Sequence, residues 1–140
     1  MIWGSFVLGY EDDDRDLLKK TFEFAKGNKL LLANFNTLNP MPGTALYQRL
    51  KKENRLLEEY WWRFEKYKYG EIMFQPQNMS IPELKEECIK LRRRFNSYTN
   101  ILYRAFDLKS NSKNISNCAL FLTVNMTARQ QMLSKMREIQ

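Results

Sequence analysis

The chain has 140 residues, of which 44% are hydrophobic and 14% aromatic, so it can build a packed core. It carries 23 Lys and Arg against 16 Asp and Glu, a net charge of +7, and it contains no histidine. The absence of histidine excludes most zinc sites, the serine and cysteine triads and histidine acid–base chemistry. The composition therefore predicts a folded chain with a basic surface and without histidine-based catalysis.

Cys88 and Cys118 are the two cysteines, and no secretory signal precedes them, so we expect free thiols and a cytoplasmic location. Cys88 falls on an apolar helical stripe, which favours a buried structural thiol. No apolar run approaches the roughly 20 residues that a membrane helix needs, so no membrane partner is expected.

The first part of the chain has the pattern of a strand, a helix and a second strand. Residues 2–10 and 30–36 are apolar runs typical of strands buried on both faces. The acidic residues 11–14 suit a helix N-terminus, and Gly27 with Asn28 ends the helix. Short links in this order predict two parallel strands. The expected apolar helix positions are Leu17, Leu18, Thr21, Phe22, Phe24 and Ala25.

A loop and a short helix are expected next. Two prolines and a glycine in residues 39–44 end the second strand. Thr44 can cap a helix that runs to about Asn54, with Leu46 and Leu50 on its inner face. The aromatic residues 60–64 receive no assignment, and residues 71–74 are expected to be extended.

Residues 80–83, Ser-Ile-Pro-Glu, form a strong helix start with a Ser cap, an early Pro and a Glu placed for a capping box. Apolar residues then recur at spacings that alternate between four and three, which predicts one helix from about Pro82 to Ala105. We expect this helix to be the longest, with a single buried seam. The seam positions are Leu84, Cys88, Leu91, Phe95, Tyr98, Leu102 and Ala105.

The end of the chain is expected to contain a polar linker, residues 109–114, and then an apolar patch, residues 118–124. A last helix should follow, capped near Asn125 or Thr127. The densest basic run, residues 90–94, lies in a helical pattern and is expected to be a solvated face.

Six segments, taken together in their order and spacing, match the pattern of a known enzyme family: residues 4–13, 33–36, 40–47, 61–62, 74–84 and 92–97. They resemble the late barrel strands and the C-terminal extension of radical S-adenosylmethionine (SAM) enzymes that carry a cobalamin-binding domain. The resemblance covers nearly the whole chain. It implies a mostly helical α/β fragment of a partial (β/α) barrel, with residues 1–57 as the last two strand–helix units and residues 58–140 as a helical C-terminal extension.

The resemblance also implies cofactors for the full-length family. Its members hold an iron–sulfur cluster through a CxxxCxxC motif, use SAM, and in this group bind cobalamin. The chain lacks that motif, and Cys88 and Cys118 cannot replace it. We therefore expect a truncated fragment that binds no cofactor alone and is not catalytic in isolation.

Four residues are carried over as candidates for the SAM or substrate side of the barrel: Gly9, Glu11, Asn34 and Asn36. Asn34 and Asn36 share one face of a strand because side chains alternate with a period of two. Polar packing would equally explain the two asparagines, and turn chemistry or helix capping would explain Gly9 and Glu11.

Two other functions remain open. A small basic module could bind RNA or a partner protein through Arg92, Arg93 and Arg94 with stacking aromatic residues, although the chain has no nucleic-acid signature and RNA is not expected. A helical docking domain could present the seam to a partner. Finally, the first strand is uncharged, so its free edge predicts self-association.

Overall fold

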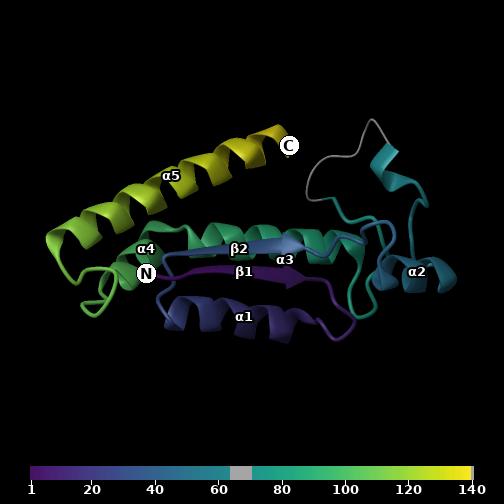
Figure 1. Ribbon diagram of the computed structural model, residues 1–140, viewed down its shortest axis with the longest axis horizontal. Coiled ribbons are helices and arrows are strands. Elements are labelled where there is room, and N and C mark those ends of the chain that lie inside the picture. The colour runs from purple at the N-terminus through teal and green to yellow at the C-terminus, as the bar shows by residue number, and fades with distance from the viewer. Residues whose placement is uncertain (64–70, 140) are drawn as a thin grey trace.

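The computed structural model describes residues 1–63 and 71–139. Within these ranges the fold is α/β, with five α-helices, one short 3-10 helix and a two-stranded parallel sheet (Figure 1). In chain order the elements are β1 (Trp3–Leu8), α1 (Arg15–Gly27), β2 (Leu32–Thr37), α2 (Ala45–Lys52), the 3-10 helix (Trp61–Arg63), α3 (Ile81–Phe95), α4 (Tyr98–Ala105) and α5 (Ile115–Ile139).

The expected strand–helix–strand unit is confirmed. β1 and β2 pair in parallel, from Trp3 opposite Leu32 to Leu8 opposite Thr37. The Asp14 side chain caps α1 by accepting a hydrogen bond from the Leu17 N–H at 2.7 Å. The helix ends at Gly27, as its sequence indicates. Local signals therefore determine this part of the fold.

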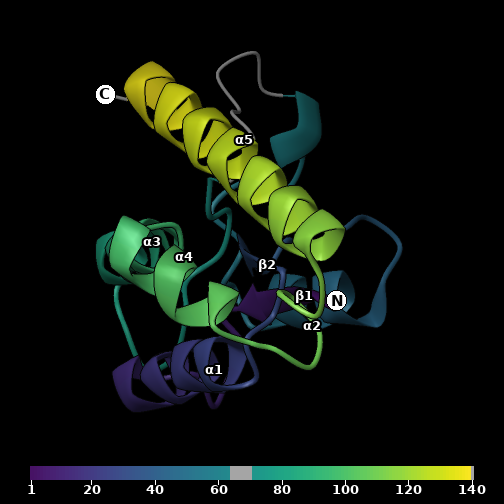
Figure 2. The same cartoon turned by 90° about the vertical axis from the view of Figure 1, so that its left-hand side faces the viewer.

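The prediction that both strands are buried on two faces is wrong within the described chain. α1 and α3 lie on the same side of the sheet (Figure 2). On the face that they cover, Phe35 is fully buried. On the opposite face Trp3 is 65% exposed and Val7 43% exposed. More buried and more exposed positions alternate along β1 because helices cover only one side of this sheet.

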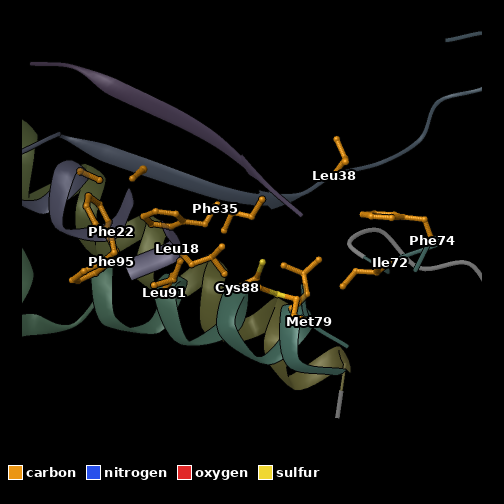
Figure 3. Packing of buried hydrophobic residues seen from close by; sticks show 14 of the residues in the cluster. Leu18, Phe22, Phe35, Leu38, Ile72, Phe74, Met79, Cys88, Leu91 and Phe95 are labelled. Carbon is orange, nitrogen blue, oxygen red and sulfur yellow. The ribbon is translucent and has the colours of Figure 1, made fainter. Parts of the chain in front are cut away.

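The core lies between the sheet and the helices α1 and α3 (Figure 3). The Phe35 ring stacks on Phe6, with centroids 5.4 Å apart, and meets the Phe95 ring edge-on at 5.8 Å. α3 packs on β2, so this core joins residues from both sides of the division expected at residue 57. That division itself stays a prediction.

The single helix expected from about Pro82 to Ala105 is instead two helices, α3 and α4. The predicted start is confirmed, since Ser80 and Glu83 form a reciprocal capping box. α3 ends at Phe95 because the Asn96 side chain donates to the Arg92 carbonyl at 2.9 Å, while Ser97 caps α4. Side chains that bond to nearby backbone groups compete with helix continuation.

The break changes the buried seam. Leu84, Cys88, Leu91 and Phe95 are buried as expected. Beyond the break Ile101 and Arg104 are buried, whereas Tyr98 is 59% and Leu102 55% exposed. The second half of the predicted seam is therefore wrong, because α4 starts in a new direction and presents a different face to the core.

The last helix begins earlier than its sequence suggested. α5 starts at Ile115, where the Asn114 side chain accepts a hydrogen bond from the Asn117 N–H at 2.8 Å. A start near Asn125 or Thr127 is therefore wrong, and α5, not the 82–105 segment, is the longest described helix. None of the described helices is both long and apolar enough to cross a membrane.

The first prediction concerns the core. Phe95→Ala should lower the free energy of unfolding by about 3–5 kcal/mol, because a fully buried ring is removed and leaves a cavity. Arg93→Ala, at an exposed position two residues away, should change it by less than about 0.5 kcal/mol. Urea unfolding followed by circular dichroism measures both. Equal midpoints for the two variants would contradict the packing of α3.

The second prediction concerns the thiols. Burial raises the pKa of the Cys88 thiol to about 11, so it stays protonated at pH 8. Cys118 is half-buried. Native protein should show one fast thiol toward a chromogenic disulfide reagent, and Cys118→Ser should remove it and leave a thiol at least about 100-fold slower. Fast labelling of native Cys118→Ser protein would contradict the burial of Cys88.

Candidate functional site

The uncovered face of the sheet carries polar side chains. Asn34 lies opposite Ser5, and Asn36 lies opposite Val7. Asn34 and Ser5 are exposed, and the Asn36 amide lies 3.5 Å from the Ser5 hydroxyl. The structure thus places both candidate asparagines on the open face, away from α1 and α3. These groups can donate and accept hydrogen bonds to a ligand that lies on the sheet.

Gly9 lies directly after β1, in a position that no other residue fits without strain. Its φ is +110°, and a Cβ atom there would lie 2.8 Å from the Leu84 side chain and 3.3 Å from Phe74. Its N–H donates to the Asp13 carboxylate at 2.6 Å. Packing and turn geometry therefore account for this glycine within the chain.

Glu11 fixes the same loop to later parts of the chain. Its carboxylate lies 3.0 Å from the Arg49 guanidinium and 3.7 Å from that of Arg55. Its backbone carbonyl accepts a hydrogen bond from the Asn78 amide at 2.7 Å. Glu11 is thus engaged with neighbouring segments, whereas Asn34 is exposed on the open face and Asn36 is half-buried beside Ser5.

An aromatic cluster that the sequence left unassigned lies beyond the carboxyl end of β2. We call it the aromatic corner: Tyr47, Tyr60, Trp61 and Trp62. The Trp61 indole N–H donates to the Pro40 carbonyl at 3.2 Å, and Pro40 follows β2 closely. The Trp62 ring makes edge-to-face contacts with the other three rings. The density of aromatic residues at 60–64 was the available signal for this cluster.

Side chains from the C-terminal helices occupy the outer edge of β2. Arg92 donates to the Phe35 carbonyl at 2.7 Å. Arg104 donates to the carbonyls of Leu30 and Leu31, both at 2.8 Å, just before β2 begins. Sequence reasoning missed Arg104, because nothing in a helical stripe distinguishes a buried arginine from an exposed one.

Arg104 is fully buried and lies 3.7 Å from the centre of the Phe95 ring. Burial lowers its pKa to about 10, so the guanidinium remains charged at neutral pH. It has no ion pair with a described residue, and carbonyl oxygens accept its N–H groups in place of a carboxylate. This arrangement makes Arg104 a structural residue.

The basic run at residues 90–94 is only partly a solvated face. Arg92 is half-buried and bonded to β2, and the Arg94 guanidinium lies 4.3 Å from the centre of the Phe22 ring. Arg93 is exposed. Much of the run therefore holds α3 in place, which weakens the alternative of an RNA-binding patch.

No three or more His, Cys, Asp or Glu side chains of residues 1–63 and 71–139 come together so that they could hold a metal ion. Cys88 and Cys118 are both free thiols.

Comparison with known proteins gives partial similarity to methyltransferases. The chain is 32% identical over 92 residues to bacteriochlorophyllide d C-12(1)-methyltransferase of Chlorobaculum tepidum, covering 66% of this chain and 19% of that protein. It is 34% identical over 61 residues to an uncharacterized methyltransferase of Pyrococcus horikoshii, 44% of this chain and 13% of the relative. An uncharacterized methyltransferase of Synechocystis sp. is 35% identical over 54 residues, which cover 39% of this chain and 10% of the relative.

No family model and no solved structure matches the chain. The chain spans less than a fifth of the length of each relative. These findings correct the identification with cobalamin-binding radical SAM enzymes, because what the relatives' names share is methyl transfer. The order and spacing of six short segments were too general to specify that group. The chain is similar to short segments of methyltransferases.

Proposed function

We propose that this chain is a segment of a SAM-dependent methyltransferase that forms one side of its binding site and does not transfer methyl groups alone. The observation that carries the proposal is the similarity over 92 residues to a methyltransferase of which the chain spans 19%. The iron–sulfur cluster and cobalamin expected from the resemblance are not part of this proposal.

The open face of the sheet is the ligand side in this proposal. Ligands of parallel α/β sheets bind near the carboxyl ends of the strands, and Asn36 is the second-last residue of β2. Asn34 makes no side-chain hydrogen bond with the described residues, so its amide is available. The hydroxyl and amino groups of SAM are suitable partners for the amides of Asn34 and Asn36. Gly9 and Glu11 then shape the adjoining loop.

The sheet is proposed to continue in the longer protein. Two strands alone make a marginal sheet, because three or more are usually needed for independent stability. Arg92 and Arg104 already bind carbonyl groups at the outer edge of β2, so further strands would pair with the free edge of β1. Repeated strand–helix units added on that side give the partial (β/α) barrel that the resemblance implied.

The third prediction tests the ligand face. The sequence led us to expect that the chain alone binds no cofactor, whereas the open face proposed here should bind SAM weakly. Titration of the isotope-labelled chain with SAM should therefore shift the amide signals of Ser5, Asn34 and Asn36 in NMR spectra, and Asn34→Leu with Asn36→Leu should weaken binding about 10-fold or more. Gln130→Leu, an equally apolar change at an exposed position of α5, is the matched control. Shifts that occur elsewhere, or that survive in the double variant, would contradict the assignment of this face.

The free edge of β1 is proposed to make the isolated chain self-associate. β1 has no charged residue to block edge pairing, and within the described ranges only β2 pairs with it. Trp3 and Val7 add exposed apolar area on the same strand. A second copy can pair with this edge and cover part of that surface.

The fourth prediction tests this edge. The chain at tens of micromolar should run as a dimer or larger species in light scattering, and Val7→Lys should shift it toward monomer because a charge would be buried at the contact. Gln130→Lys adds the same charge on α5 and should change nothing. A strict monomer with strong amide protection from Phe6 to Leu8 would contradict the proposal.

A further inference from the structure

We propose that the aromatic corner binds a flat, conjugated ring that carries an anionic group. Its two accessible members are Tyr60, 49% exposed, and Trp62, 39% exposed. Their rings meet with centroids 5.7 Å apart and planes at 70°. Two ring faces at this angle form a corner in which a flat ligand can stack on one ring and meet the edge of the other.

Two buried rings, those of Trp61 and Tyr47, pack against Trp62. Trp61 is 3% exposed and meets the Trp62 ring at 5.8 Å with the planes 88° apart. Tyr47 is 5% exposed, and its ring lies 5.9 Å from that of Trp62. Because its neighbours are fixed, the exposed part of Trp62 is oriented before a ligand arrives, which lowers the entropy cost of binding.

Two hydrogen bonds hold the aromatic corner in place, one to the loop after β2 and one from α2 to the segment before Tyr60. Trp61 donates to the carbonyl of Pro40, three residues after the end of β2. The Tyr47 hydroxyl, on α2, donates to the Glu59 carbonyl at 2.8 Å. The exposed rings are thereby placed beyond the carboxyl end of a parallel strand, where α/β proteins bind ligands. Met41, 54% exposed in the adjoining loop, adds an adaptable apolar contact.

The charge beside these rings favours an anion. The Arg63 guanidinium lies 5.3 Å from the centre of the Tyr60 ring, and Arg63 forms no ion pair with the described residues. The nearby Glu59 carboxylate is neutralised by Lys51. Arg63 is therefore available to a carboxylate on the ligand, and its planar group suits that geometry.

The binding inference stands on these contacts alone. We further infer that the bound ring is the methyl acceptor, and this second inference rests on the proposed function. Tyr60, Trp62 and Arg63 are all exposed, so a ligand can reach both rings and the cation.

The test uses equilibrium dialysis of the full chain against pyrene-1-carboxylate, a flat ring with one carboxylate. Binding should weaken about 10-fold or more in Trp62→Leu and in Tyr60→Leu, because stacking is lost. Trp62→Phe should retain part of the affinity. Trp3→Leu, which removes an exposed indole from the sheet face, is the matched control and should bind normally. Circular dichroism of each variant shows whether it is folded.

Two further probes separate the contributions of ring and charge. Pyren-1-ylmethylammonium, the cationic counterpart, and adamantane-1-carboxylate, a carboxylate without a flat ring, should both bind at least about 10-fold more weakly. Arg63→Gln should abolish the preference for the carboxylate over the ammonium. Equal binding by Trp62→Leu and the unchanged chain, or tight binding of adamantane-1-carboxylate, would overturn the proposal. No methyl donor is present, so this result is independent of the SAM titration.

Discussion

The fold depends on one buried guanidinium. Arg104, on α4, donates hydrogen bonds to the carbonyls of Leu30, Leu31 and Phe95 and to the side chain of Asn125. It therefore joins the sheet to α3 and α5 at one point. A buried charge is costly unless its donors are satisfied. Here oxygen acceptors bind both terminal nitrogens and the Phe95 ring lies against the guanidinium, while the Nε–H has no hydrogen-bond partner among the described residues. An aliphatic side chain could fill the space but would remove these hydrogen bonds, leaving the Leu31 carbonyl, among the described residues, with only its contact to the Asn125 amide.

The same contacts make the two edges of the sheet unequal. Arg92 and Arg104 meet carbonyls along the outer side of β2, and the Asn125 amide adds a third contact at Leu31. β1 has no comparable cover within the described ranges. The β2 edge of the sheet is thus covered, and the β1 edge is open within the described ranges. Trp3 is exposed for a separate reason, because α1 and α3 cover only the other face of the sheet.

Local signals in the sequence predicted much of the fold. Asp14, Thr44 and Ser80 all cap helices where expected, since a cap depends on a few neighbouring residues. The break between α3 and α4 was not predictable from spacing, because the apolar period continues through Asn96 and Ser97 while their side chains terminate the helix. The early start of α5 was missed because Asn114 was interpreted as part of a linker and not as a cap.

The candidate site was less accessible to sequence reasoning. The shared face of Asn34 and Asn36 follows from strand alternation, but the aromatic corner unites Tyr47 with residues more than ten positions later and depends on tertiary contacts. The family assignment failed for a related reason, since short motifs describe a common strand–helix unit better than they describe one enzyme group.

The contacts of Arg104 also bear on the order of events during synthesis. They join positions 73 and 74 residues apart, and the Asn125 contact with Leu31 spans 94 residues. β2 therefore leaves the ribosome long before the groups that complete its edge exist. Contacts between such distant positions slow folding, and an unfinished strand is exposed to wrong pairing in the interval. During synthesis the residues that lead into β2 therefore lack their contacts with α4 and α5 until those helices have been made.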